Sequence, residues 1–144
     1  FQDFTQKGYT VFLKRIEKFG SINIVEFGEV KGQANPKIVK NMEAEKILVK
    51  LKPDDFLILL DEKGKSFTSV EFADFIQKKE NQSIKKLVFL IGGAYGFDEK
   101  VYERANDKIS LSKMTFSHQL IRLIFMEQLY RAYAIMNNFP YHNE

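Results

Sequence analysis

Three glycines and a run of hydroxyl side chains follow apolar stretches, and these are the parts of the sequence best suited to holding a ligand. Gly92, Gly93 and Gly96 come directly after the apolar run 87–91, and the segment 112–117 holds two serines and a threonine. Glycine lets a backbone approach a ligand closely, and the exposed amides can form hydrogen bonds to a nucleoside. A tight turn from strand to helix explains the glycines as well, and on spacing alone it is the better interpretation.

His118 and His142 are the only histidines, and the chain contains no cysteine. This count excludes a cysteine nucleophile, a thiolate metal site and a metal cage built on histidines, so catalysis would rely on other groups or on a cofactor. His118 follows the segment 112–117, where it could accept a proton, bind phosphate, or simply make a hydrogen bond at the start of a helix. His142 lies with Tyr141 in a C-terminal tail that has little reason to pack unless it closes a site.

Glu127 and Arg131 interrupt an apolar helical stretch and are spaced four residues apart, so they share one face of a helix. An ion pair with a purely structural role is a strong interpretation of this spacing. The same pair could instead orient a catalytic tail or contact RNA phosphates, and for that role we favour Arg131 over Arg122.

Charge and motifs limit the possible functions. The formal net charge of +3 and the pI near 9.0 allow a nucleic-acid partner without requiring one. No G-x-x-x-x-G-K-[ST] motif occurs, which excludes a P-loop, and the glycines do not match G-x-G-x-x-G, so a dinucleotide site is weakly supported. Apolar runs such as 56–60 are far shorter than the ~20 residues of a membrane span. We expect a cytoplasmic protein without membrane contact.

Predicted strands and helices alternate along the chain, which predicts a single α/β domain over 1–144 with a mainly parallel sheet. Two continuous apolar runs are typical of parallel strands buried on both faces. The expected elements are a helix over 1–19, a strand over 22–27, a helix from Pro36 to about Leu51, a strand over 56–60 ended by the polar residues 61–64, a helix opened by the capping pattern Thr68-x-x-Glu71, a strand over 87–91, a short helix over 98–106, a strand at 109–111 and a final helix over 118–137.

The final predicted helix, 118–137, carries apolar residues on nearly all sides. Such a helix needs cover all round, and in a domain of this size the sheet can cover only one face. We therefore expect this C-terminal helix to mediate a homodimer, with a central core helix of a monomer as the second interpretation.

Several motifs resemble one family closely. The resemblance is very specific from about Phe56 onward and looser before it. The motifs are Phe89-Leu-Ile-Gly-Gly-Ala-Tyr-Gly-Phe97, the runs 109–122 and 127–132, the closing Pro140-Tyr-His142, and Leu59-Leu-Asp-Glu-Lys-Gly64. They resemble the small, stand-alone SPOUT methyltransferases of the ribosomal large subunit, the RlmH or YbeA-like family.

The resemblance implies an α/β fold with a C-terminal trefoil knot, a homodimer, and S-adenosylmethionine bound in the knot, without a metal. Family members use the C-terminal tail at the substrate face, which favours functional roles for Tyr141 and His142 that reach across the dimer. Carried over by motif, the cofactor contacts fall on Leu60, Gly93, Ser112, Lys113, Met114, Thr115, Phe116 and Ser117.

Two departures from the family pattern affect these expectations. The family opens with a strand and a turn resembling Val-Gly-Lys before the first helix, and this sequence has neither, so the expected sheet lacks its N-terminal strand. The family tail also carries a basic residue after Tyr-His, where this chain has Asn143, so the substrate contact at that position is expected to differ.

The resemblance implies an S-adenosylmethionine-dependent enzyme that methylates N3 of a pseudouridine in the helix 69 loop of 23S rRNA within the assembled 70S ribosome. Methyl transfer is a direct displacement, so such an enzyme mainly has to hold the base in line with the methyl group. The catalytic candidates are His118, Arg131, Tyr141 and His142. Two alternatives remain, a nucleotide-binding α/β oxidoreductase and a non-catalytic RNA-binding dimer.

Overall fold

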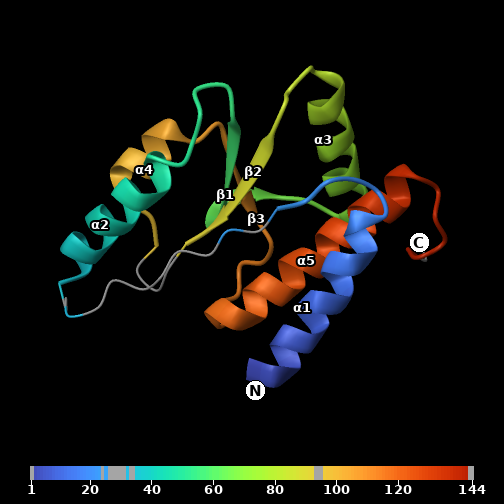
Figure 1. Ribbon diagram of the computed structural model, residues 1–144, viewed down its shortest axis with the longest axis horizontal. Helices are drawn as coiled ribbons and strands as arrows, with labels where there is room; N and C mark the ends of the chain where they lie inside the picture. Colours follow the sequence, from blue (N-terminus) through green and yellow to red (C-terminus); the bar gives the residue numbers. More distant parts are fainter. Residues whose placement is uncertain (1, 24, 26–31, 33–34, 93–95, 143–144) are drawn as a thin grey trace.

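The computed structural model describes residues 2–23, 25, 32, 35–92 and 96–142 (Figure 1). Helices and strands alternate over much of this range, in agreement with the predicted α/β class. The elements are α1 (Gln2–Glu17), α2 (Pro36–Leu48), β1 (Phe56–Ser66), α3 (Ser69–Asn81), β2 (Leu87–Ile91), α4 (Glu99–Arg104), β3 (Asp107–Ser110) and α5 (His118–Met136).

The strands of the described residues form one parallel sheet in the order β2-β1-β3, which confirms the predicted mainly parallel sheet. Parallel strands need crossover connections, and a helix lies in each connection, α3 between β1 and β2 and α4 between β2 and β3. Figure 1 shows α2 and α4 on one side of the sheet and α1, α3 and α5 on the other. Both faces are therefore covered, as the continuous apolar runs require.

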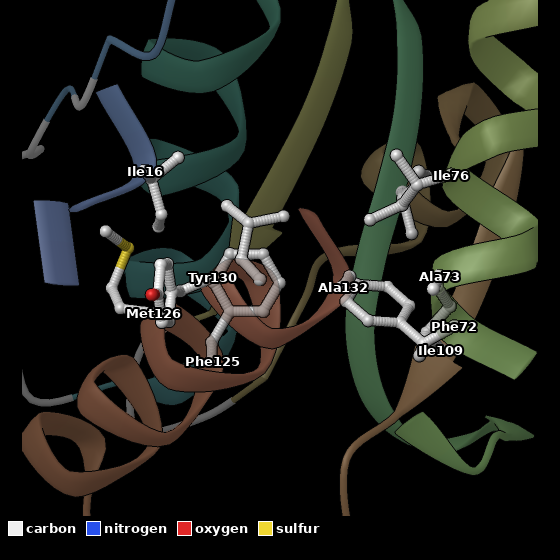
Figure 2. Close-up of a cluster of buried hydrophobic side chains, with 11 residues drawn as sticks. Ile16, Phe72, Ala73, Ile76, Ile109, Phe125, Met126, Tyr130 and Ala132 are labelled. Atoms are coloured by element: carbon white, nitrogen blue, oxygen red, sulfur yellow. The ribbon is translucent and has the colours of Figure 1, made fainter. Parts of the chain in front are cut away.

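Strand β1 contributes side chains to both layers because successive residues of a strand point to opposite faces. Leu57 and Leu59 pack in the core with α2 and α4, while Ile58 packs in the core with α3 and α5. All three side chains are fully buried. Burial of each contributes roughly 1.5–3 kcal/mol to stability. Figure 2 shows the larger core, in which side chains from α1, α3 and α5 meet over the sheet.

The end of β1 differs from the prediction. The sequence predicts that the strand ends at Leu60 because the polar residues 61–64 follow it, but β1 continues to Ser66, so this prediction is wrong. Leu60 and Lys65 both pair with Ile109 of β3, and the residues between them form a bulge. The polar residues do interrupt the pairing, but the strand resumes beyond them.

Gly64 allows the bulged strand to return to β3. A Cβ at Gly64 would lie 2.6 Å from the Ile109 nitrogen, so the two backbones approach more closely than any other residue allows. Within the bulge, the Lys63 amide donates to the Asp61 carboxylate at 3.0 Å, a local turn that aspartate favours. The polar residues 61–64 thus form a bulge and not the end of the strand, because Lys65 and Ser66 pair again with β3 beyond them.

The start of each of two helices follows its sequence signal. The Asn35 side chain caps α2, and Thr68 and Glu71 form the predicted capping box of α3. Helix α2 ends at Leu48 rather than near Leu51. The reason is local, because the amides after Val49 bond to carbonyls only three residues back, which tightens and closes the last turn.

Gly8 lies where α1 crosses α5. A Cβ at Gly8 would come within 2.8 Å of the Leu123 Cδ1, so the glycine that weakens the predicted first helix also lets the two helices approach closely. The predicted strand over 22–27 is wrong in its described part, because positions 22, 23 and 25 have no strand pairing, and the rest lies outside the described residues. Strand β3 ends at Ser110, so Leu111 is not part of it.

Candidate active site

The carboxyl ends of the parallel strands share one edge of the sheet, which is where ligands bind in open α/β sheets. Leu60 lies at this edge as the last paired residue of β1 before the bulge, between Ile91 of β2 and Ile109 of β3. Its side chain is half-buried. A ligand bound at this edge would therefore contact the sheet at Leu60.

The segment 111–117 leaves β3 at the same edge and leads into α5. Its first half is held by side-chain hydrogen bonds, because the Ser110 hydroxyl donates to the Ser112 carbonyl at 3.0 Å and the Ser112 hydroxyl accepts from the Met114 amide at 2.9 Å. Met114 is nevertheless 74% exposed. An ordered loop with an exposed apolar side chain is suited to covering a ligand.

The second half of this segment is tied to two other elements. The Thr115 hydroxyl lies 3.5 Å from the Glu62 carboxylate of the β1 bulge, and the Ser117 hydroxyl accepts from the Leu120 amide as the N-cap of α5. Of the candidate cofactor residues in this segment, Ser112 and Phe116 are half-buried. The other four are exposed, namely Lys113, Met114, Thr115 and Ser117. The predicted cofactor residues of this segment and Leu60 thus meet at one edge of the fold.

The glycines after β2 have structural reasons of their own. A Cβ on Gly92 would come within 3.0 Å of the buried Phe97 ring, and Gly96 has a φ of +81°, which favours glycine. Gly92 and Gly96 therefore have structural roles of their own, and Phe97 packs in the core with Leu57 and Leu59. Gly93 lies outside the described residues.

The chain reverses direction after α5. Asn138 has a φ of +55°, its amide donates to the Ile135 carbonyl at 3.2 Å, and the Phe139 amide donates to the Ala134 carbonyl at 2.8 Å. These two bonds form a Schellman motif, in which asparagine is an accepted substitute for glycine. The motif turns residues 139–142 back toward the last turns of α5, at the end of the molecule marked C in Figure 1.

The returning tail builds a polar cluster on α5. Glu127 accepts at Oε1 from Arg131 Nε at 3.0 Å, from Arg131 Nη2 at 2.5 Å and from the Tyr141 hydroxyl at 3.3 Å. Arg131 Nη1 lies 3.0 Å from His142 Nδ1, and the guanidinium stacks 4.8 Å from the centroid of the Tyr141 ring. We call Glu127, Arg131, Tyr141 and His142 the tail cluster. Three predicted catalytic residues therefore lie together.

Tyr141 is a hydrogen-bond donor in this cluster. Burial raises its pKa above the usual value, and the negative charge of Glu127 raises it further, while the charges of Arg131 and Arg15 act in the opposite direction. Its ring also packs edge to face on Tyr130 with centroids 4.7 Å apart. At neutral pH the hydroxyl therefore stays protonated and donates to Glu127, so it cannot serve as a base.

His118 does not join the tail cluster. It is exposed at the first position of α5, next to the segment 111–117, while Arg131 lies near the other end of the same helix. At 1.5 Å rise per residue, the two positions are roughly 20 Å apart along the helix axis. The predicted site residues therefore form two groups, one at the sheet edge and one at the tail.

A family model described as "Predicted SPOUT methyltransferase" matches residues 2–142. The chain belongs to this family. The match includes the sheet edge, the segment 111–117 and the tail cluster, so both groups of candidate residues lie in the part of the chain that carries the family pattern.

Curated SPOUT relatives cover most of the chain. A protein of Parabacteroides distasonis is 61% identical over 105 residues, 73% of this chain and 67% of its own length. Proteins of Bacteroides thetaiotaomicron and Flavobacterium psychrophilum are 50% and 52% identical over 92% and 94% of this chain, and 86% of each relative is covered. All three are named ribosomal RNA large subunit methyltransferase H. This chain is therefore similar to methyltransferases, which disfavours the oxidoreductase alternative.

In the part of the chain that the structure describes, no three His, Asp or Glu side chains gather in a way that could hold a metal ion. Within the same residues, no helix combines the length and the apolar character needed to cross a membrane.

Sequence reasoning missed one interaction near the sheet edge. The Tyr102 hydroxyl of α4 donates to the Asp61 carboxylate in the β1 bulge, and the Tyr102 ring packs on Phe97 with centroids 5.8 Å apart. The two residues are 41 positions apart and belong to no short motif, so spacing gave no signal. The contact ties α4 to the bulge beside Leu60.

Tyr102 gives a testable alkaline titration. Burial, followed by the hydrogen bond to Asp61 and the charge of Asp61, raises the pKa of Tyr102 from 10.0 to about 12. The contact therefore stabilises the fold fully below about pH 10, and its contribution is lost as the pH rises through about 12. In a phenolate absorbance titration, Tyr102→Phe should remove the step near 12, and Asp61→Asn should move it toward 10.

The exposed Asp74, which pairs with Lys78 on α3, supplies the control for this titration. Asp74→Asn should leave the highest tyrosine step where it is in the wild-type protein. An unchanged step in Asp61→Asn would show that the carboxylate does not act on Tyr102.

Proposed function

We propose that this chain is an S-adenosylmethionine-dependent ribosomal RNA methyltransferase that methylates N3 of a pseudouridine in the helix 69 loop of 23S rRNA, within the assembled 70S ribosome. The observation that carries the proposal is the relationship to proteins named ribosomal RNA large subunit methyltransferase H, at 50–52% identity over more than nine tenths of the chain. The pseudouridine, its N3 atom and helix 69 come from the resemblance of the motifs. A ribosomal substrate puts the reaction in the cytoplasm.

The sheet edge fits the proposed cofactor. Leu60 and Phe116 offer half-buried apolar surface for an adenine ring, and the backbone of the segment 112–117 offers amides and carbonyls for its polar edge. Gly93, assigned by the resemblance of the motifs, is the remaining proposed contact to S-adenosylmethionine. When bound, S-adenosylmethionine supplies a methyl group activated by a positively charged sulfur. We also propose that the segment 112–117 is part of the family's C-terminal trefoil knot.

The chain's own residues have two tasks in such a reaction. They must hold the pseudouridine so that N3 faces the methyl group, and they must favour loss of the N3 proton. His118, exposed beside the segment 111–117, is the candidate proton acceptor. His142 Nδ1 accepts from Arg131 Nη1, so we assign His142 to positioning the substrate. Tyr141 and Arg131 hold the tail in place through their hydrogen bonds to Glu127.

We further propose a homodimer in which the site is composite. The sheet edge and the tail cluster lie roughly 20 Å apart along α5 of one chain, too far to contact the same base. A second copy packed through α5 would bring its tail cluster to the sheet edge of the first. In support, the first half of α5 carries apolar side chains that are only half-buried in one chain, namely Leu120, Ile121, Leu123 and Ile124.

A ribosome methylation assay tests the proposed activity. We expect intact 70S ribosomes from a strain that lacks this methyltransferase to accept one radiolabelled methyl group, mapped to the helix 69 loop, and wild-type ribosomes to accept none. Cofactor binding is measured in parallel by calorimetry with S-adenosylmethionine and with NAD.

The outcomes of this assay separate the alternatives. Ribosome binding without cofactor binding or methyl transfer would favour the non-catalytic RNA-binding dimer. Binding of NAD in preference to S-adenosylmethionine would contradict the proposal and restore the oxidoreductase.

A further inference from the structure

Arg15 of α1 lies beside the tail cluster and has a charge that no acidic side chain of the described residues balances. Its guanidinium is exposed and lies 5.7 Å from the ring centroids of both Phe12 and Tyr130. The ion pairs of the described residues do not include it. An arginine held by two aromatic rings keeps its donors directed outward, ready for an anionic partner.

Arg131, the arginine that the sequence favoured for contact with RNA, is differently placed. Two of its nitrogens, Nε and Nη2, donate to Glu127 Oε1, and Nη1 lies against His142 Nδ1. Its positive charge is therefore largely compensated by Glu127, and its donors serve to position the tail. Of the two arginines at this end of the molecule, Arg15 is the one with charge available for a phosphate.

A continuous row of contacts joins Arg15 to the tail. The guanidinium packs on Tyr130, and the Tyr130 ring packs edge to face on Tyr141, 4.7 Å between centroids. The positive charge of Arg15 also lowers the pKa of Tyr141, so it acts electrostatically on the tail cluster. Figure 1 shows α1 lying along α5, with the C-terminal end of α1 toward the end of α5 from which the tail returns. An RNA strand bound at Tyr141 and His142 would pass Arg15.

We propose that Arg15 binds a backbone phosphate of the ribosomal RNA next to the nucleotide that the tail cluster contacts. This inference rests on the proposed function and adds a substrate-binding residue on α1. A planar guanidinium can give two parallel hydrogen bonds to one phosphate, which fixes the strand without reading its sequence. Arg15 is a binding residue and takes no part in proton transfer.

Substitution of Arg15 tests this role in the full-length protein with 70S ribosomes. Arg15→Gln should raise the KM for ribosomes roughly tenfold and leave kcat and S-adenosylmethionine affinity near wild type. The slope of log binding constant against log salt concentration, measured by ribosome pelleting without turnover, should become shallower by about 0.7, the value for one phosphate contact on a single strand. Arg15→Lys keeps the charge but loses the planar fork, so it should keep the salt slope and show an intermediate KM.

Lys7→Gln is the matched control. It removes one exposed positive charge from the same helix, roughly 12 Å from Arg15 along the axis, and should leave the KM and salt slope close to wild type. The inference is overturned if Arg15→Gln behaves like Lys7→Gln, or if it lowers kcat while the KM stays constant. A wild-type protein that methylates no ribosomes would instead refute the proposed function, while pelleting would still decide the role of Arg15.

Discussion

Arg131→Ala is expected to reduce methyl transfer to ribosomes on the order of a hundredfold, because the tail that carries Tyr141 and His142 loses its attachment to α5. Arg131 donates two hydrogen bonds to Glu127, through Nε and Nη2, and its Nη1 contacts His142. Its guanidinium also stacks on the Tyr141 ring. Without it, Glu127 keeps only the Tyr141 hydroxyl as a donor within the cluster. Steady-state kinetics with 70S ribosomes measure the loss.

The same substitution should also destabilise the protein. The side chains of Arg131 and Glu127 are only 24% and 22% exposed, so removing one partner leaves a partly buried carboxylate without its counterion. The expected cost is roughly 1–3 kcal/mol, measured by urea unfolding. Arg131→Lys should recover much of this stability through its charge but little of the activity, because lysine cannot form the fork that also contacts His142.

Lys78→Ala is a matched control for Arg131→Ala. It breaks an ion pair of the same i, i+4 spacing, Lys78 with Asp74 at 2.9 Å, on the exposed face of α3. Both side chains are well exposed, so stability should change by less than about 0.5 kcal/mol and activity should stay at the wild-type rate. Full activity in Arg131→Ala would show that the tail does not depend on this arginine, and the assigned role would be wrong.

The sequence was most informative where one residue type determines local structure. The apolar run 56–60 predicts a buried parallel strand, since only a strand covered on both faces tolerates continuous apolar side chains, and the capping box at Thr68 predicts the start of α3. The spacing of Glu127 and Arg131 likewise predicts the ion pair that the structure contains.

The remaining features depend on contacts between distant residues. Whether the polar residues 61–64 end a strand or form a bulge is decided by Ile109, and no local pattern shows that pairing. The place of Arg15 depends on Tyr130, far along the chain. The return of the tail did have a local signal, because an asparagine just after a helix is typical of a left-handed cap, and Asn138 fits that pattern.

Gly64→Ala is expected to destabilise the fold strongly, because the new methyl group would collide with the backbone of β3. A Cβ at this position would lie 2.6 Å from the nitrogen of Ile109 and 2.6 Å from the carbonyl carbon of Lys108. Backbone atoms of a paired strand cannot turn away as a side-chain end can, so β1 and β3 must separate at the bulge. Overpacking of this kind costs roughly 1–3 kcal/mol or more.

The substitution should lower the Tm by roughly 3–10 °C in a thermal unfolding experiment. It should also weaken S-adenosylmethionine binding, because the displaced strands carry Leu60 and lead into the segment 111–117. Gly20→Ala is the control, since nothing lies within 4 Å of a Cβ built there, and it should change the Tm only slightly. Equal Tm values for the two variants would show that the backbone of β3 does not lie in contact with Gly64, which would contradict the close approach of the two strands at the bulge.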